Sequence, residues 1–162
     1  MSETASEAKP STAAFTDTLR RIRESIDGLS EAQLIWKPAP DKWSVKEVVA
    51  HLVDSSIVHS VRVRKIVTEP HPVLPVYDQD AWVAGARSNE AAIADILQTY
   101  EVILTYNAMF YGRITDADWE KVGDTNGKQV TVAELFQGFI RHVGIHLAQI
   151  DRTKAALPSG LV

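Results

Sequence analysis

Hydrophobic residues recur at intervals of three and four along four separate stretches of this chain, a spacing that places them on one side of an α-helix. In the last stretch, residues 131–156, they are Val132, Phe136, Phe139, Ile140, Val143, Leu147 and Ile150. The same spacing predicts helices near residues 12–28, 44–68 and 89–111. The sequence therefore predicts four long helices.

Capping boxes mark several of the predicted helix starts. In this motif a Ser or Thr pairs with an acidic or amide residue three positions later, and each satisfies a backbone N–H of the first turn. The motif occurs at Ser30, Ser44, Thr115 and Thr131. The boxes at Ser44 and Thr131 open long helices, and the other two open single turns. We expect Ser88 or Asn89 to cap the third long helix.

Residues 69–87 interrupt the helical pattern with Pro70, Pro72 and Pro75, which favour an extended path. We expect a connector there, with one helical turn around residues 80–83. Extended, it reaches on the order of 50–60 Å at about 3.3 Å per residue, whereas a helix of about 25 residues is about 38 Å long. The connector can therefore return along the bundle and leave the second and third helices parallel.

The dipeptide Asn126-Gly127 is a strong signal for a two-residue hairpin turn. It predicts a small β-ribbon before the fourth helix. Together these patterns predict an all-α fold, a four-helix bundle with a long crossover between helices 2 and 3.

The chain has 162 residues, the size of one domain. We expect a disordered tail over residues 1–11 and a single domain over residues 12–157. A net charge of −4 gives no electrostatic footprint for nucleic acid or an anionic membrane. No apolar run approaches the roughly 18 residues of a membrane span. The absence of cysteine excludes disulfides, thiolate ligands and a cysteine nucleophile, and it suits a reducing cytosol, so we expect a cytoplasmic protein.

Two histidines of the last helix are candidates for metal binding. His142 and His146 are four residues apart, so they project from one side of the helix. Together they can bind one transition-metal ion if another element supplies a third ligand. The alternative is that carbonyls, water or ion pairs satisfy them. Val143 follows His142, so this is not the His-Glu-x-x-His motif of zinc proteases.

The second helix carries a polar strip beside its apolar face. The strip consists of residues at offsets of 0, 4, 7 and 11, which point in nearly the same direction around the helix axis: His51, Ser55, Val58 and Arg62. A histidine, a hydroxyl and an arginine in one strip predict a pocket wall. The alternative for Arg62 is an ion pair with an acidic residue such as Asp54 or Asp78.

The two halves of the chain share one order of elements. Each has a helix, a short capped turn, a tryptophan (Trp36 or Trp119), an irregular stretch, a capping box and a histidine-bearing helix. This repetition makes His51 of the second helix the natural partner of His142 and His146.

Several segments of the sequence, taken in order, resemble one known family. They are residues 43–55, Arg62, residues 68–70, residues 75–78, Ala81 with Trp82, and residues 142–150. With them the chain resembles the DinB-like family, most closely its YfiT-like branch of metal-dependent enzymes, over roughly residues 29–150. The resemblance implies that His51, His142 and His146 bind one divalent metal ion, Ni²⁺ or Zn²⁺ foremost. The branch often has further histidines beside the last pair, where this chain has Gly144, Ile145 and Gln149.

Three neutral imidazoles leave at least one metal position open, as in catalytic sites. Such an ion can lower the pKa of bound water or hold a thiolate. The resemblance thus implies either a hydrolase or an enzyme that transfers a low-molecular-weight thiol, such as bacillithiol or mycothiol, to an electrophile. We favour thiol transfer, because no general base accompanies the histidines, with Arg62 and Ser55 as substrate-binding residues. No catalytic side chain is assigned.

The alternative from another class is a non-catalytic, stress-associated bundle with a structural metal ion. It requires a fourth protein ligand, for which Asp54 and Asp78 are the candidates. Four tryptophans are too many to leave exposed, and we expect a homodimer that covers some of them. We interpret His59 and His71 as structural residues, although His59 lies close enough to the polar strip to line the pocket.

Overall fold

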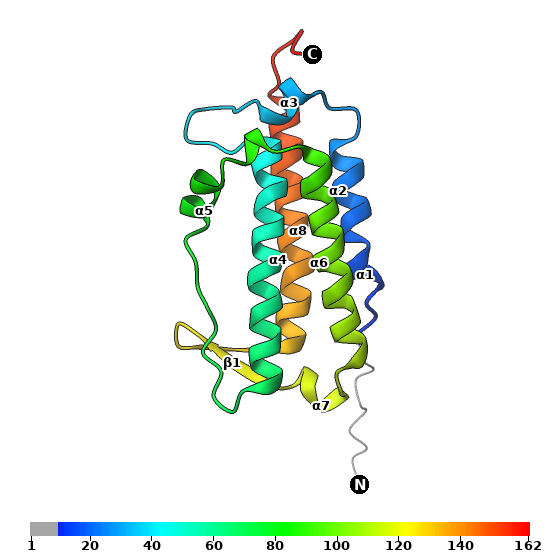
Figure 1. Cartoon of the computed structure of the whole chain (residues 1–162), viewed down its shortest axis with the longest axis vertical. Coiled ribbons are helices and arrows are strands. Elements are labelled where there is room, and N and C mark those ends of the chain that lie inside the picture. Colours follow the sequence, from blue (N-terminus) through cyan, green and yellow to red (C-terminus); the bar gives the residue numbers. More distant parts are fainter. Residues whose placement is uncertain (1–9) are drawn as a thin grey trace.

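A bundle of long helices forms the body of the protein (Figure 1). The computed structural model describes residues 10–162, so most of the tail predicted over residues 1–11 lies outside the described residues. The helices are α1 (Ala13–Thr16), α2 (Thr18–Ile26), α3 (Glu31–Ile35), α4 (Val45–Thr68), α5 (Gln79–Ala86), the 3₁₀ turn η1 (Ser88–Glu90), α6 (Ile93–Arg113), α7 (Asp116–Trp119) and α8 (Val132–Ala155). The strands are β1 (Val122–Thr125) and β2 (Lys128–Thr131). The predicted all-α four-helix bundle is confirmed.

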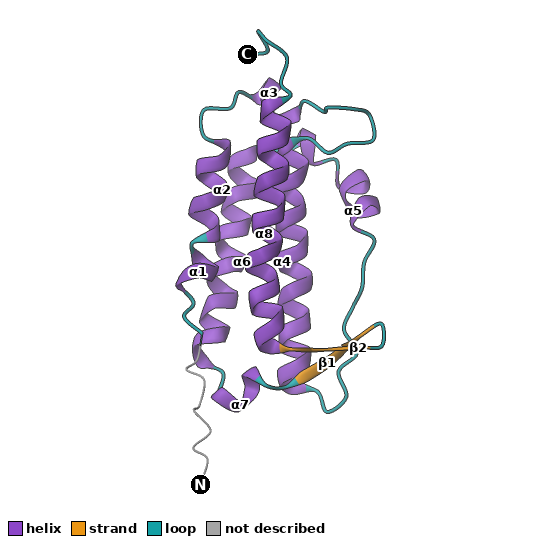
Figure 2. Ribbon diagram, turned by 180° about the vertical axis from the view of Figure 1, so that it is seen from behind, coloured by secondary structure: helices purple, strands orange, loops and turns teal. Residues whose placement is uncertain are grey.

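The long helices run in two directions. Helices α1, α2 and α8 run one way, and α4 and α6 run the other way, so α4 and α6 are parallel (Figures 1 and 2). The segment between them returns along the bundle and carries the short helix α5. This arrangement is the long crossover predicted from the connector's length. It places the crossover beside α4, the helix that carries His51.

The capping boxes all form. At the start of α4, the Glu47 N–H donates to Ser44 Oγ (3.1 Å) and the Ser44 N–H donates to the Glu47 carboxylate (2.8 Å). The Thr131 box opens α8 in the same way. Each box satisfies donors that a helix start would otherwise leave unpaired. The two helices that carry the candidate metal ligands therefore begin at fixed positions.

One predicted helix start is wrong, and one predicted helix is divided in two. Neither Ser88 nor Asn89 caps the third long helix, because these residues form the turn η1 and α6 begins at Ile93. Instead, the Ser44 hydroxyl donates to the Asn89 side-chain oxygen (2.7 Å). The first helix is interrupted at Asp17, which nevertheless keeps helical dihedral angles.

The core follows the predicted apolar faces, with one clear exception. Core members from each long helix include Phe15, Ile22, Val48, Leu52, Tyr100, Leu104, Phe136, Val143 and Ile150. The helical spacing of the third stretch places Met109 with Ile93, Leu97, Tyr100 and Leu104 on the buried side, but Met109 is 51% exposed, and Asn107 and Tyr111 are buried instead. Arg64 of α4 donates a hydrogen bond to the Asn107 side-chain oxygen (2.9 Å), which satisfies the acceptor of this buried amide.

The predicted ribbon is present and is attached to the crossover. Asn126 and Gly127 both have positive φ (51° and 79°), as a type I′ hairpin turn requires. The Leu74 N–H donates to the Asp124 carbonyl (2.8 Å), and the Asp124 N–H donates to the Pro72 carbonyl (2.9 Å). The ribbon therefore fixes the start of the crossover next to the start of α8.

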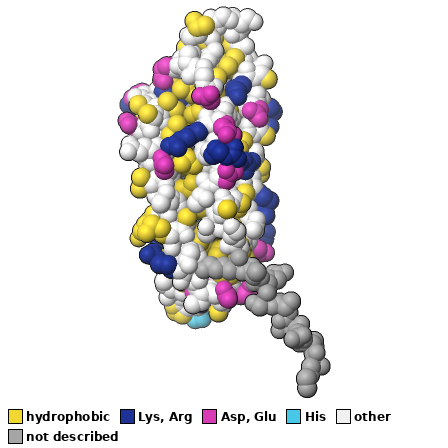
Figure 3. Space-filling view, turned by 90° about the vertical axis from the view of Figure 1, so that its right-hand side faces the viewer, with side chains coloured by type: hydrophobic (Ala, Val, Ile, Leu, Met, Phe, Trp, Pro, Cys, Tyr) yellow, Lys and Arg dark blue, Asp and Glu magenta, His cyan; other side chains and the backbone are white. Residues whose placement is uncertain are grey.

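Charged side chains of both signs alternate over the face formed by the N-terminal helices (Figure 3). Arg20 pairs with Asp17 and Glu24, and Arg23 pairs with Glu101 of α6. Within the described part of the chain, no helix is both long enough and apolar enough to cross a membrane.

Candidate metal centre

Three histidines from two helices converge inside the bundle. The Nε2 atom of His142 lies 3.0 Å from Nε2 of His146 and 3.3 Å from Nε2 of His51. His51 is fully buried in α4, and His146 of α8 is 7% exposed. One nitrogen of each ring can reach a common point, because these atoms all lie within 4.8 Å of one another.

Neighbouring side chains hold two of these rings in place. His146 Nδ1 lies 2.8 Å from the Gln149 side-chain oxygen, which can only accept, so Nδ1 donates its proton. Nε2 of His146 is thereby left with a lone pair. The Trp43 ring stacks on His146 and lies against His51, with ring centroids 6.0 and 4.9 Å apart. Trp43 directly precedes the Ser44 cap, so the start of α4 also positions this aromatic wall.

Burial keeps the three imidazoles neutral. It lowers the pKa of His51 to about 3, with further contributions from His146 and His142. Burial, followed by the neighbouring His146, lowers the pKa of His142 to about 4. The pKa of His146 is also lowered by burial, although the hydrogen bond with Gln149 opposes the shift. At neutral pH the cluster therefore offers nitrogen lone pairs rather than positive charge.

The cluster fits a divalent metal ion. Three neutral rings whose Nε2 atoms face one another cannot all satisfy those atoms mutually, whereas one cation satisfies them together. Three imidazole nitrogens are a ligand set of catalytic zinc sites and also suit nickel. In the described part of the chain no carboxylate joins the cluster. Asp54 and Asp78, the fourth ligands that a structural site would need, are therefore not members of it.

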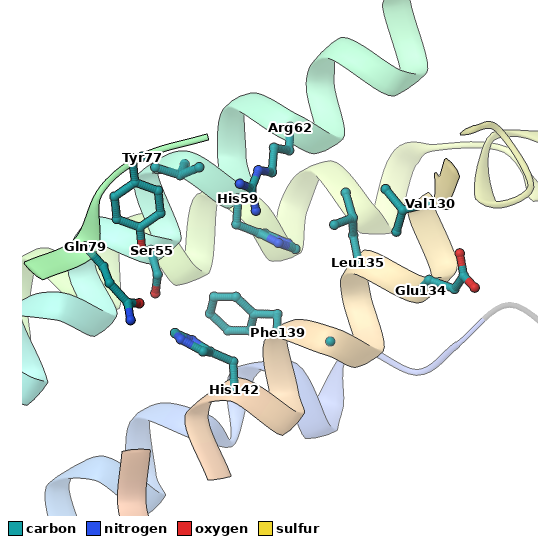
Figure 4. Close-up of a pocket in the computed structure, with 12 residues that line it drawn as sticks. Ser55, His59, Arg62, Tyr77, Gln79, Val130, Glu134, Leu135, Phe139 and His142 are labelled. Carbon is teal, nitrogen blue, oxygen red and sulfur yellow. The ribbon is translucent and has the colours of Figure 1, made fainter. Parts of the chain in front are cut away.

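A cavity of about 410 Å³ adjoins the histidine cluster at His142 (Figure 4). Its walls come from α4, the crossover, the ribbon and α8. The lining residues include Ser55, Val58, His59, Arg62, Tyr77, Gln79, Val130, Glu134, Leu135 and Phe139. The structure therefore brings Ser55, Val58 and Arg62 to one wall, as the helical offsets predicted. Its volume falls in the range of small-molecule sites.

Arg62 does not form either ion pair considered from the sequence. Its Nε and Nη2 groups donate to the Pro75 carbonyl of the crossover (3.0 and 2.7 Å). Asp54 and Asp78 are not its partners, and Asp78 instead caps α5 by accepting from the Ala81 N–H. Burial lowers the pKa of Arg62, which still keeps the side chain cationic at neutral pH. Arg62 thus ties the crossover to α4 while facing the cavity.

His59 is packed and hydrogen-bonded as a structural residue would be, and it also lines the cavity, as its place close to the polar strip allowed. It is 6% exposed, lines the cavity, and has its Nε2 atom 2.7 Å from the Tyr111 hydroxyl of α6. Its position eight residues after His51 indicated the neighbouring helix face, but the contact with Tyr111 depends on tertiary packing. His71 is exposed on the crossover, away from the histidine cluster. The Ser55 hydroxyl donates to the Leu52 carbonyl of its own helix (3.1 Å).

The family model of the DinB superfamily matches residues 14–150, a span that contains α4, α6, most of α8 and the three clustered histidines. The chain belongs to the DinB superfamily. Among the DinB relatives, a protein of Bacillus licheniformis named "Putative metal-dependent hydrolase" is 26% identical over 132 residues, 80% of this chain and 74% of that protein. A protein of Oceanobacillus iheyensis with a similar name is 24% identical over 80% of this chain and 75% of its own length.

Solved structures of the same fold include YfiT from Bacillus subtilis, described as a probable metal-dependent hydrolase with an unusual four-helix bundle topology. It is 18% identical, with a TM-score of 0.83, over 96% of this chain and 89% of that one. A mycothiol-dependent maleylpyruvate isomerase is 13% identical, with a TM-score of 0.70. That match covers 91% of this DinB chain and 61% of the isomerase. Both likenesses concern the fold.

Proposed function

We propose that this DinB protein is a metal-dependent enzyme that transfers a low-molecular-weight thiol to an electrophilic small molecule held in the cavity. One observation carries the proposal. A cluster of three neutral histidines opens through His142 onto a cavity, and no carboxylate accompanies the cluster in the described part of the chain. Such a site can activate a nucleophile, but no acidic side chain beside the cluster is positioned to deprotonate water.

The residues of the site have separate roles in this proposal. One divalent ion, Zn²⁺ or Ni²⁺, is held by His51, His142 and His146. Gln149 keeps His146 in the tautomer whose Nε2 can bind the ion. When bound, the ion supplies a Lewis acid that lowers the pKa of a thiol. Arg62 holds an anionic group of the substrate by charge-assisted hydrogen bonds. Because the chain has no cysteine, the thiol must come from a cosubstrate. The mycothiol dependence of the isomerase with this fold supports this choice.

Hydrolysis is the second candidate, and the names of the curated relatives favour it. Glu134 is the carboxylate that lines the cavity. However, one of its oxygens already accepts the Thr131 N–H (2.8 Å) in the capping box of α8. A hydrolase would therefore have to rely on metal activation of water without help from this residue.

Four assays on the metal-loaded protein separate the candidates. An ester and a halogenated electrophile are each tested with and without an added low-molecular-weight thiol. We expect turnover of the electrophile only with the thiol, whereas ester cleavage without thiol would favour the hydrolase. No turnover in any of the four assays, with metal bound, would favour the non-catalytic bundle.

The native metal, the homodimer and the cytoplasmic location stay predictions. Elemental analysis of protein purified without a nickel column identifies the metal. Light scattering coupled to size exclusion tests the dimer, for which the half-exposed Trp82 beside Tyr77 is a candidate contact. A monomer at micromolar concentration would contradict the expected dimer.

A further inference from the structure

A buried histidine–tyrosine pair borders the cavity next to the metal centre. His59 of α4 and Tyr111 of α6 are 6% and 0% exposed. The Tyr111 hydroxyl lies 2.7 Å from His59 Nε2. The two rings are enclosed by aromatic side chains, with Phe139 and Phe15 centred 4.8 and 6.0 Å from the His59 ring. Neither the metal centre nor the proposed thiol transfer accounts for this pair.

The protonation of the pair follows from its burial. Burial raises the pKa of Tyr111, so the hydroxyl keeps its proton. Burial lowers the pKa of His59 to about 3, and the nearby Arg62, Arg64 and His142 add to the shift. The ring is therefore neutral, with one donor nitrogen and one acceptor nitrogen. Among the described residues, His59 Nε2 is the acceptor within reach of the Tyr111 hydroxyl.

These facts select one tautomer. If Tyr111 donates to Nε2, both buried groups are satisfied and His59 carries its proton on Nδ1. The opposite tautomer would leave the buried hydroxyl proton without an acceptor, which costs on the order of 1–3 kcal/mol. In the described chain, Nδ1 of His51 is shielded from solvent and has no hydrogen-bond partner. Nδ1 of His59 is not shielded in this way. His59 thus presents an N–H donor on a residue that lines the cavity.

Arg62 presents a second donor beside it. The two residues are three apart on α4 and project on one side of the helix (Figure 4). Nε and Nη2 of Arg62 donate hydrogen bonds to the Pro75 carbonyl, whereas Nη1 has no hydrogen-bond partner among the described residues. The remainder of this part of the wall is apolar, from Val58, Val130, Leu135 and Phe139.

We infer that His59 Nδ1–H and Arg62 Nη1 form an anion-binding site that takes one carboxylate of a ligand with an apolar body. Arg62 is the cation that lines the cavity, and the negatively charged Glu134 lies at the end away from His142 (Figure 4). With one positive and one negative side chain in its lining, the cavity favours a ligand with one carboxylate over a ligand with two. The inference rests on the proposed function only in placing the substrate in this cavity, with its reactive end toward His142.

The tautomer is tested first, by ¹⁵N NMR of the histidine rings in the full-length, chelator-treated protein. We expect His59 to show a protonated Nδ1 and an unprotonated Nε2, unchanged between pH 8 and pH 5. In Tyr111→Phe the acceptor role of Nε2 is lost, so the two tautomers should mix. A protonated Nε2 in the unsubstituted protein would overturn the assignment.

The anion site is tested with benzoate and its neutral counterpart benzamide, by calorimetry on the same chelator-treated protein. Benzoate should bind more tightly than benzamide. Arg62→Gln should weaken benzoate binding by about tenfold to a hundredfold, the range for a hydrogen bond to a charged group. The double variant His59→Phe, Tyr111→Phe should weaken it by about tenfold, and it leaves no buried hydroxyl unpaired. Each variant should weaken benzamide binding less than it weakens benzoate binding.

Arg152→Gln is the matched control, because it removes one positive charge from an exposed position of α8. It should leave benzoate affinity unchanged. Equal affinity for benzoate and benzamide, or unchanged benzoate affinity in both site variants, would overturn the anion site. Because the metal is absent from this experiment, its failure counts against the anion site alone. Intact benzoate binding without turnover of any substrate would count against the proposed function alone.

Discussion

His146 lies between the ring of Trp43 and the side chain of Gln149. If it is one of three ligands, His146→Ala should lower Zn²⁺ affinity by at least a hundredfold, beyond the loss typical of outer hydrogen-bond partners. Competition with a chromophoric chelator measures this affinity. His71→Ala is the control, since His71 is exposed and outside the cluster. Unchanged stoichiometry and affinity in His146→Ala would contradict the ligand assignment.

Gln149 contributes without touching the metal. Its side-chain oxygen accepts the His146 Nδ1 proton, which fixes the tautomer and the ring orientation. Gln149→Leu should therefore weaken Zn²⁺ binding by about tenfold to a hundredfold. Gln98→Leu, at an exposed position of α6, is the matched control. Equal affinities in the two variants would show that Gln149 does not orient the ligand.

For single side chains, the sequence reveals contacts within one helix and misses those between helices. The spacing of His142 and His146 is a local property of α8, so their shared face was predictable. The approach of His51 was inferred from the similarity of the two halves and from the family resemblance. The hydrogen bond between His59 and Tyr111 joins residues 52 apart in sequence. No periodicity within either helix indicates it.

The N-terminal cap of α4 supports more than its own helix. Ser44 Oγ accepts the Glu47 N–H and donates to the Asn89 side chain, and Ser44 is fully buried. Ser44→Ala should therefore cost about 1–2 kcal/mol in the free energy of unfolding, at the upper end for a cap. Urea denaturation measures the loss. Thr115→Ala, which removes the exposed cap of the one-turn helix α7, should cost less. A larger loss in Thr115→Ala would contradict this reading of Ser44.

The predicted helix starts are right where the cap bonds within its own helix, and wrong where the expected cap bonds to another element. All four capping boxes form as the sequence predicts. Asn89 looks like a cap for the third helix, but Ser44 Oγ and the buried Lys46 ammonium both bind it. The third helix consequently starts four residues later, at Ile93.

For the whole molecule, the core and the metal centre are separable. The buried core is formed by aliphatic and aromatic side chains from every long helix. Removing the metal with a chelator should therefore abolish activity while the helical content stays nearly unchanged. Circular dichroism before and after chelation measures this directly. Unfolding on chelation would instead indicate a structural metal ion, as in small zinc domains that fold only with metal.

Acid should destabilise the metal-free protein through its buried histidines. The pKa values of His51 and His59 are lowered to about 3 in the folded chain, compared with about 6.5 in an unfolded one. Between these values the unfolded chain binds more protons, so stability falls as pH falls. The slope approaches about 1.4 kcal/mol per pH unit for each buried histidine. Urea denaturation at pH 7.5, 6 and 5 measures it.

The double variant His59→Phe, Tyr111→Phe isolates one histidine's share of that slope. It removes a ring that must lose its proton on folding, and it leaves no buried polar partner behind. Its unfolding free energy should therefore depend less steeply on pH, by about one proton between pH 6 and 5. Gln98→Leu, which removes no titratable group and lies at an exposed position of α6, is the control and should keep the full slope. Identical slopes in the double variant and the unsubstituted protein would mean that His59 is protonated inside the fold, which would also remove the neutral donor from the cavity.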